Sequence, residues 1–521
     1  MKKIFLFFIS LIFVVKSFSC TNFIVTKGAS TDGSAFLVYT NDGEWLYRLK
    51  KNPAKDYKQG EWRKTGSGKI PQVLHTYATL GFHMNEFQLS IGETTFTGRE
   101  ELWNKKNFVK YWHLMQIALE RAKNAREAIR VITSIVEKYG YGSEGESFSI
   151  VDPNEAWILE MIGRGENEKG AVWVAVKIPD GYVSAHANMS RIGEFPLNDT
   201  TVCYYSKDII KFAADKGYYD LKNPRPFRFN EIFNPPTPER LKYCESRVWS
   251  IFNRVAPSLN LSTDYCRGVK GASRYPLYVR PDKKLSIKDV AAIIRDHYEG
   301  TEFDMTKGIQ AGPFGNPNRV RPLNWEANGE KHQWERAIST YNSAFSFIAQ
   351  MRSRLPDNIG GIVWFGEDDT YSTCYLPMYV GINKIPEAYT VGDINKFSWK
   401  SAWWVFNFVA NFANIRYVDM IKDIQKTQRK HENLYISQID SIDAKALELL
   451  KSSKEEANNF LTDYVVKSGD KLIDDWINLG EFLITKYNDG YVKDENNHKI
   501  KQTGYPKEWY NKVDNYNKNC K

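Results

Sequence analysis

Residues 20–42 read CTNFIVTKGASTDGSAFLVYTND, and the spacing of apolar and turn-forming residues in this stretch decides the expected fold. Two apolar-rich segments, 20–28 and 35–42, are separated by the residues ASTDGS. β-Branched and aromatic residues favour strands, whereas Gly, Asp and Ser favour tight turns. The stretch therefore predicts a β-hairpin that begins at Cys20 and ends in a polar corner at Asp42.

The chain after this hairpin alternates between strand and helix patterns. Strands are expected within 75–96, 147–163 and 171–193, where apolar residues lie between turn signals. Apolar residues recur at helical spacing over 107–139, and a second helix is expected over 285–300. Strands, helix and strands in this order indicate a sheet covered by helices, which is an α+β arrangement.

The composition is that of a globular protein, since 42% of the 521 residues are hydrophobic and 26% are charged. The formal charge of +9 is spread without a run of five basic residues, which argues against nucleic-acid binding. The six cysteines show no C-x-x-C spacing and the eight histidines form no H-E-x-x-H motif, so no metal or cofactor is expected. The length fits several domains or one large body with an appendage.

The first 19 residues have the parts of a secretory signal peptide. Two lysines precede an apolar run over 4–15, and small residues at positions 17 and 19 form a cleavage site before Cys20. The run is shorter than the roughly 20 residues that a membrane-spanning helix needs. We therefore predict cleavage after Ser19 and export, to a periplasm or to the outside of the cell, of a chain that starts at Cys20.

A cysteine at a mature N-terminus has two chemical interpretations. In a lipoprotein the thiol is lipidated, although the position three residues before the cleavage site is Ser17 here instead of the usual Leu. In an N-terminal nucleophile, the free α-amine, with a pKa of about 7.7–8.0, serves as the base for the thiol of the same residue. No catalytic histidine is then required. A third alternative is that Cys20 is incidental at this junction.

Four further residues could serve acyl-transfer chemistry, and each also has a purely structural interpretation. Asp42 could hold the α-amine and tune its pKa, or be an ordinary turn residue before a glycine. The Asn188 amide could donate to a developing oxyanion, or cap a turn. Thr95 could supply another donor, or be a β-branched strand residue. Arg247 could be a cation of the site, or a surface arginine near the start of a helix.

Long stretches of the chain resemble one enzyme family. The opening stretch 20–42 is similar to the start of the N-terminal nucleophile hydrolases of the dipeptidase A and secernin group, which are related to penicillin V acylase and bile salt hydrolase. The resemblance continues through MNEFQLSIGETTF (84–96), WVAVKIPDGYVSAHANMSRIG (173–193) and HYEGTEFDMTKGIQAGPFGNPNRVRP (297–322). It extends to ERAISTYNSAFSFIAQMRSRLPDNIGGIVWFGEDDTYSTCYLPMY (335–379).

The resemblance implies an α+β fold of the four-layer αββα sandwich type over residues 20–400. The amphipathic pattern of about 401–489 predicts two or three helices, so 401–521 is expected to be a mainly helical region packed on the sandwich. It also implies that Cys20 is nucleophile and base, that Asp42 lies beside the terminal amine, and that Asn188 is in the oxyanion hole.

Two placements within the resemblance depart from the pattern of the family. Thr95 lies ten residues after Asn85, at a position where the acylase relatives carry Tyr or Asn. Threonine is a shorter donor than either of these residues. Arg247 follows Ser246 and resembles the arginine of an S-R-x-x sequence in the relatives.

The implied activity is hydrolysis of short peptides, chiefly dipeptides with a free N-terminus, through a thioacyl enzyme at Cys20. Glu93 lies two residues before Thr95, hence on the same face of the strand, and is the expected contact of the substrate ammonium. The acidic run 367–369 is an alternative for this contact, or a solvated turn after the WFG strand.

Two other functions fit the same sequence. One is an N-acyl amide hydrolase of the same fold, and the other is a lipidated binding protein that stacks sugars on its many aromatic rings. The expected partners are small peptide substrates, with no nucleic acid and no membrane-spanning helix in the mature chain. The sequence leaves open whether the chain forms a homo-oligomer and whether Cys244 and Cys266 form a disulfide.

Overall fold

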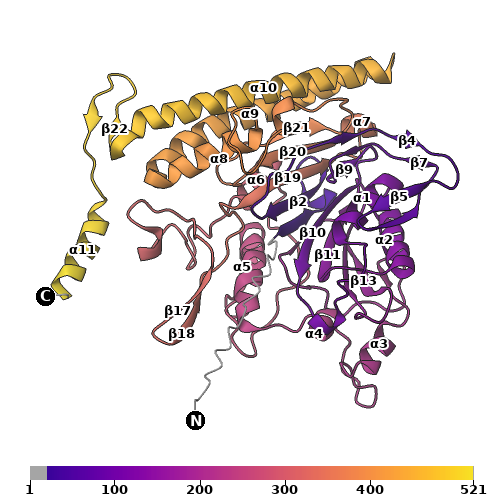
Figure 1. Cartoon of the computed structure of the whole chain (residues 1–521). Helices are drawn as coiled ribbons and strands as arrows, with labels where there is room; N and C mark the ends of the chain where they lie inside the picture. The colour runs from indigo at the N-terminus through magenta and orange to yellow at the C-terminus, as the bar shows by residue number, and fades with distance from the viewer. Residues whose placement is uncertain (1–19, 520–521) are drawn as a thin grey trace, which may run out of the picture.

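Two large antiparallel sheets form the centre of the molecule (Figure 1). The structure is a computed structural model, and it describes residues 20–519. The predicted signal peptide, 1–19, lies outside the described residues. The fold is α+β, with helices against the outer faces of the sheets and a long helical region after residue 401 (Figure 1). Among residues 20–519, no helix combines the length and apolarity that crossing a membrane requires.

The first sheet contains the predicted N-terminal hairpin. In the hairpin of β1 (Thr21–Val25) and β2 (Ala35–Asp42), Phe23 lies opposite Val38, so the hairpin prediction is confirmed. The sheet has seven strands, including the two of the hairpin, in the order β16 (Tyr278–Val279), β14 (Val183–His186), β1 (Thr21–Val25), β2 (Ala35–Asp42), β19 (Ser343–Met351), β20 (Gly361–Glu367) and β21 (Leu376–Tyr379). The hairpin is thus central, because a strand from far along the chain pairs with each of its sides.

The second sheet has eight strands and is built from the middle of the N-terminal half. Its order is β15 (Cys203–Tyr205), β13 (Ala171–Ile178), β12 (Ala156–Gly163), β11 (Gly145–Val151), β10 (Ser90–Phe96), β9 (Met84–Asn85), β8 (Thr79–Leu80) and β3 (Lys51–Asn52). The consecutive strands β13 and β14 belong to different sheets. The Pro-Asp-Gly turn that follows β13 therefore carries the chain from one sheet to the other.

Four two-stranded ribbons lie outside the large sheets. They pair β4 (Lys55–Asp56) with β7 (His75–Thr76), β5 (Trp62–Thr65) with β6 (Gly68–Pro71), β17 (Asn324–Ala327) with β18 (Glu330–Gln333), and β22 (Val492–Lys493) with β23 (Ile500–Lys501). The ribbon β17–β18 projects from the body beside α5 (Figure 1).

Helices α1 (Tyr111–Arg121) and α2 (Ala125–Tyr139) pack on the second sheet. The sequence predicted one continuous helical stretch over 107–139. It is interrupted because Asn124 caps α2, its side chain accepting a hydrogen bond from the Glu127 N–H.

Helix α6 (Ile287–Ile294) lies against the first sheet and is shorter than the predicted 285–300, although its predicted cap, Ser286, forms a capping box with Asp289. The remaining helices of this part are α3 (Ile209–Asp215), α4 (Phe229–Phe233), α5 (Pro238–Val255) and the single turn α7 (Asp357–Gly360).

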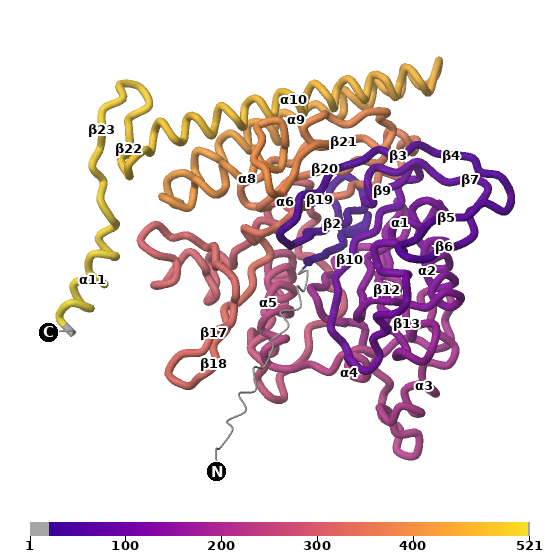
Figure 2. Tube along the Cα trace, viewed as in Figure 1, coloured from indigo at the N-terminus to yellow at the C-terminus, as the bar shows by residue number. Residues whose placement is uncertain are grey.

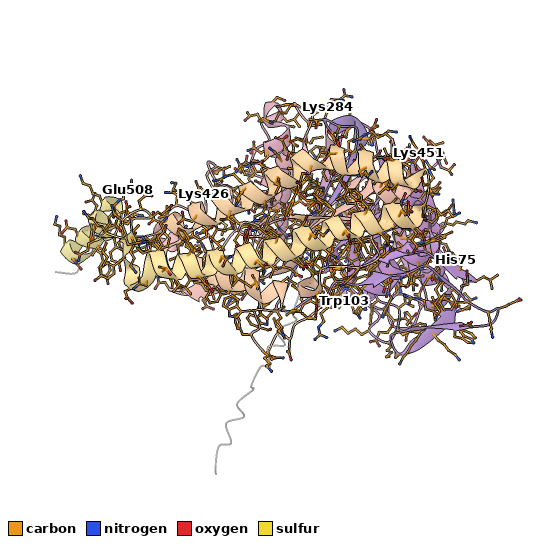
Figure 3. The ribbon with its side chains drawn as sticks, turned by 90° about the horizontal axis from the view of Figure 1, so that it is seen from above. His75, Trp103, Lys284, Lys426, Lys451 and Glu508 are labelled. Atoms are coloured by element: carbon orange, nitrogen blue, oxygen red, sulfur yellow. The ribbon has the colours of Figure 1, made fainter. Side chains whose placement is uncertain are left out.

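The C-terminal region is a set of long helices. Helices α8 (Ala402–Ala413), α9 (Tyr417–Leu450) and α10 (Lys454–Tyr487) contact one another and cover strands β20 and β21 (Figure 2). Seen from above, α9, which carries Lys426, runs beside α10, and Glu508 of α11 (Lys507–Asn519) lies away from the sheets (Figure 3). This region covers the β20–β21 end of the first sheet.

The two large sheets meet at the hairpin, where β1 and β2 contact β10 and β11. A glycine makes this close approach feasible, because a Cβ atom on Gly92 would lie 2.2 Å from Asn22 Oδ1. Asn22 Nδ2 donates to the Glu93 carbonyl oxygen across the same junction, at 2.6 Å. The hairpin therefore delivers Cys20 into the contact between the sheets.

Candidate active site

Cys20 directly precedes β1, and its thiol is enclosed between the two sheets with a residue exposure of 1%. The Sγ atom lies 3.5 Å from Glu93 Oε1, 3.8 Å from Tyr39 Oη and 4.0 Å from Asn41 Nδ2. Burial, and then the charge of Glu93, raise the pKa of the thiol well above its usual value. The thiol is therefore neutral here and needs a base before it can act as a nucleophile.

Tyr39 and Asn41 stand on the face of β2 that looks toward the second sheet. The Tyr39 hydroxyl donates to Glu93 Oε1, and Asn41 Nδ2 donates to Tyr39 Oη at 2.6 Å. Trp45 Nε1 in turn donates to Asn41 Oδ1 at 2.9 Å. These bonds fix the groups that surround the sulfur atom.

Glu93 and Glu146 form a buried carboxyl pair beside the thiol. They lie on neighbouring strands, where Thr95 of β10 is opposite Glu146 of β11. Burial raises the pKa of both groups, and the charge of Glu93 adds to the effect on Glu146. Glu93 Oε2 and Glu146 Oε1 are buried without a hydrogen-bond partner among the described residues, and the raised pKa values favour a proton held by the pair. Within residues 20–519 no basic side chain forms an ion pair with either.

Arg247 links the backbone of Cys20 to Asn188. It lies in the middle of α5 and is fully buried, so the alternative of a surface arginine near a helix start is wrong. Its guanidinium donates to the Cys20 carbonyl oxygen at 2.6 Å and to Asn188 Oδ1 at 3.0 Å. Asn188 Nδ2 donates to the Thr95 carbonyl oxygen at 2.8 Å. Three of the predicted residues thus join Cys20 in one network.

Thr95 and Asn188 have geometry that fits a constrained site. The Thr95 hydroxyl donates to Glu146 Oε2 at 3.0 Å, so it is directed to the carboxyl pair. Asn188 has a φ of 59°, a left-handed conformation in which asparagine is several-fold enriched among non-glycine residues. Asn188 lies two residues after the end of β14, and this backbone turn presents its amide to β10.

Asp42 lies on the opposite face of β2 from Tyr39 and Asn41. Its carboxylate is buried and forms an ion pair with Arg336, and Ser343 Oγ donates to its Oδ1 at 2.6 Å. Thr40 Oγ1 donates to Asp42 Oδ2 at 3.2 Å and accepts from the Thr21 N–H at 3.1 Å. Asp42 is therefore connected to the residue that follows Cys20, and no direct bond to Cys20 is formed by its carboxylate in the described chain.

The sequence interpretation missed four residues of this site: Tyr39, Asn41, Glu146 and Arg336. Tyr39 and Asn41 carried a usable signal, because polar residues alternating within a buried strand mark one of its faces. Glu146 and Arg336 gave none, since their positions depend on strand register and on a contact 294 residues apart in the chain. The solvated-turn alternative for 367–369 is wrong, because these residues are 1%, 1% and 3% exposed.

No metal site accompanies this arrangement: across residues 20–519, no group of three His, Cys, Asp or Glu residues could hold an ion. The five cysteines in that range are free and buried, so Cys244 and Cys266 do not form a disulfide.

Comparisons with known proteins agree with a peptidase. The model of "Peptidase family C69" matches residues 47–430. A "Probable dipeptidase" of Salmonella dublin is 26% identical over 418 residues, 76% of this chain and 89% of that protein. A "Probable dipeptidase B" of Streptococcus pyogenes serotype M1 is 24% identical over 492 residues, 88% of this chain and 91% of that protein. A "Dipeptidase A" of Lactobacillus helveticus is 23% identical over 441 residues, 77% and 83% of the two chains.

Proposed function

The chain belongs to peptidase family C69, and from this membership we propose that it is an exported dipeptidase whose nucleophile is the N-terminal Cys20. The family makes it a hydrolase of peptide bonds and a cysteine-type peptidase. The matched residues begin at position 47, after Cys20 and Asp42. The assignment of the nucleophile therefore rests on the contacts around the thiol.

The activation step is removal of residues 1–19. In the uncleaved chain the Cys20 nitrogen is an amide and cannot accept a proton, whereas cleavage after Ser19 makes it an amine. That amine takes the thiol proton directly or through one water, and the thiolate attacks the substrate carbonyl. The raised pKa of the thiol supports this order, because little thiolate forms without a nearby base.

The remaining residues position the groups that react. Asn188 donates to the tetrahedral oxyanion with a backbone N–H beside it, a contribution of about 3 kcal/mol in other acyl-transfer enzymes. Arg247 holds both the Cys20 carbonyl and the Asn188 amide, and Asp42 orders the chain start through Thr40 and Thr21. The terminal ammonium then protonates the leaving amine, and water hydrolyses the thioacyl enzyme with the same amine as base.

The observation that carries a dipeptidase, over an N-acyl amide hydrolase, is a carboxyl group without a cation next to the nucleophile. Glu93 Oε1 lies 3.5 Å from Cys20 Sγ and is buried. A buried carboxylate gains most from a charge-assisted hydrogen bond to an ammonium group. A substrate with a free N-terminus supplies that group beside its first carbonyl, whereas an N-acyl substrate does not.

The same proposal includes the fold type and the compartment. The two packed sheets, with α1 and α2 on one side and α9 and α10 on the other, support the four-layer αββα sandwich of N-terminal nucleophile hydrolases. Export rests on the signal-peptide pattern of residues 1–19.

Two measurements on the secreted protein test the proposal. Mass spectrometry of the mature N-terminus should find an unmodified Cys20, and Cys20→Ser should lower kcat/KM for dipeptides by roughly 10³-fold or more. Cys203→Ser, which changes a buried thiol on β15, serves as the matched control and should hydrolyse dipeptides at the wild-type rate.

Each failure has its own meaning. A processed Cys20→Ser protein with near wild-type activity removes Cys20 from the mechanism. A lipidated cysteine with an acylated amine favours the binding protein, and faster turnover of N-acyl amides than of dipeptides favours the amide hydrolase.

A further inference from the structure

A cavity of about 750 Å³ begins at the residues that surround the Cys20 thiol. Tyr39 and Asn41 line it, and these same side chains lie 3.8 Å and 4.0 Å from the sulfur atom. Its other walls come from the segment after β2, the turn after β8 and helix α1. The cavity therefore adjoins the side chains that surround the nucleophile.

The walls of this cavity are mainly aromatic. The ring of Trp45 packs edge-on against Tyr47 with centroids 5.6 Å apart, and Tyr47 packs against Phe82 at 5.1 Å. On the α1 side, Tyr111 and Trp112 lie 4.9 Å apart, and Trp112 is 48% exposed. Rings that hold one another in this way form a preformed apolar surface, which suits an aromatic or long aliphatic side chain.

The charged side chains that line the cavity are all basic. They are Arg48 and Lys50, both exposed, and neither forms an ion pair within residues 20–519. Arg48 Nε donates to the Gly392 carbonyl oxygen at 2.9 Å, which leaves its other nitrogens available. Acidic groups are thus concentrated next to the thiol, and basic groups line the adjoining cavity.

We propose that this cavity binds the C-terminal residue of the substrate, with an aromatic or long aliphatic side chain against the rings and the free α-carboxylate paired with Arg48 and Lys50. The inference rests on the proposed function and adds a substrate class to it. An ammonium at Glu93 places the first residue of the peptide at Cys20. The second residue then extends away from Glu93, past Asn41, into the basic part of the site.

The test uses the full mature enzyme and three substrates: Ala-Phe, Ala-Phe-amide and Ala-Gly. We expect wild type to prefer Ala-Phe to its amide by roughly 10- to 100-fold in kcat/KM, since a charge-assisted pair contributes that much. Arg48→Met with Lys50→Met should abolish this preference, because kcat/KM for Ala-Phe should fall toward the value for the amide, which has no carboxylate. Lys58→Met, an exposed lysine that does not line the cavity, is the matched control.

A second variant separates binding of the substrate carboxylate from the hydrogen bond that Arg48 donates to the Gly392 carbonyl oxygen. Lys50→Met alone keeps that bond and should lose part of the preference. The inference is overturned if the ratio of Ala-Phe to its amide is the same in the variants as in wild type, or if Ala-Gly is turned over as well as Ala-Phe. A wild-type enzyme that cleaves no dipeptide overturns the proposed function as well, which distinguishes the two failures.

Discussion

Two buried carboxyl sites lie on opposite sides of strand β2, and they differ in charge compensation. Asp42 pairs with Arg336 and accepts from two hydroxyl groups. Glu93 and Glu146, next to the thiol, accept from the neutral hydroxyl groups of Tyr39 and Thr95, and no cation pairs with either among the described residues. Burying an ionised carboxylate costs several kcal/mol unless a cation and hydrogen bonds offset it. Asp42 is thus kept charged by its ion pair with Arg336, and the two form a structural framework around Cys20. The glutamate pair instead retains a proton, and it can release this proton when a cationic group of the substrate binds.

The difference also shows which site depends on the rest of the chain. The cation of Asp42 comes from residue 336, so the framework around Cys20 is complete only when distant segments have folded together. The cation of Glu93 is missing from the described protein and, in our proposal, arrives with the substrate.

The largest expected effect comes from removing the cation of the framework site. Arg336→Met leaves Asp42 charged and buried without its partner, which should lower the free energy of unfolding by about 3–5 kcal/mol. Denaturant unfolding of the mature enzyme measures it. Arg354→Met is the control, because its side chain is 48% exposed, its ion pair with the Asp32 carboxylate spans 3.8 Å, and its bond to the Asp32 carbonyl oxygen is at the surface. The control should change stability by less than about 1 kcal/mol.

If Arg336→Met lowered the free energy of unfolding by less than about 1 kcal/mol, the Asp42 site would not differ from the glutamate pair in charge compensation. The double variant Arg336→Met, Asp42→Asn gives a sharper test. Removing the unpaired Asp42 charge should recover part of the stability that Arg336→Met alone costs. Equal losses for the single and the double variant would contradict a charge-compensated pair.

The next effect concerns the uncompensated site. Glu93→Gln keeps the shape of the side chain and removes its charge, so kcat/KM for Ala-Phe should fall roughly 10- to 100-fold. Hydrolysis of N-acetyl-Ala-Phe, which has no ammonium, should not fall. The ratio of the two rates is the measurement, because a general loss of folding would lower both.

Glu160→Gln is the matched control for that ratio. Glu160 is also a buried glutamate of the second sheet, but Ser190 and the backbone N–H groups of Arg191 and Ile192 donate to it. Its change should reduce stability and leave the ratio unaltered. A Glu93→Gln enzyme with the wild-type ratio would exclude Glu93 from binding the N-terminus.

Local sequence spacing predicted the parts of the site that lie on one hairpin or one strand. Cys20 and Asp42 follow from the turn between β1 and β2, and the shared face of Glu93 and Thr95 follows from strand periodicity. The burial of Arg247 could not be predicted, because it depends on α5 packing against β14. The Asp42–Arg336 pair lies beyond any local pattern, and the residue roles themselves stay predictions.

The same limit applied to the fold. The α+β class follows from the order of strand and helix patterns, and the hairpin from its turn residues. The separation of β13 and β14 into different sheets leaves no mark in the sequence, since a Pro-Asp-Gly turn serves a hairpin and a crossover equally well. The break between α1 and α2 was readable at Asn124, a residue type that favours N-caps.

The smallest effect is a difference in pH dependence, and it tests the proton on the glutamate pair. Because the folded pKa of Glu146 is raised, the folded chain keeps a proton that the unfolded chain releases above about pH 4.5. Stability contributed by this group is present below that pH and is lost as the pH rises. Glu146→Gln removes the loss, so from about pH 5 to pH 6 wild type should lose up to about 1.4 kcal/mol more than the variant.

Glu155 supplies the control of opposite sign. Burial opposes it, but hydrogen bonds from Arg126 and Lys177 lower the pKa of Glu155 to about 2. Its stabilising contribution is therefore present above about pH 4.5 and is lost as the pH falls toward 2, so Glu155→Gln should flatten the acid limb of the stability curve. If Glu146→Gln also changed only the acid limb of the stability curve, Glu146 would be an ionised carboxylate with a compensating partner, like Asp42. The two carboxyl sites on either side of β2 would then not differ in charge compensation, and the glutamate pair would have no proton to release when the substrate binds.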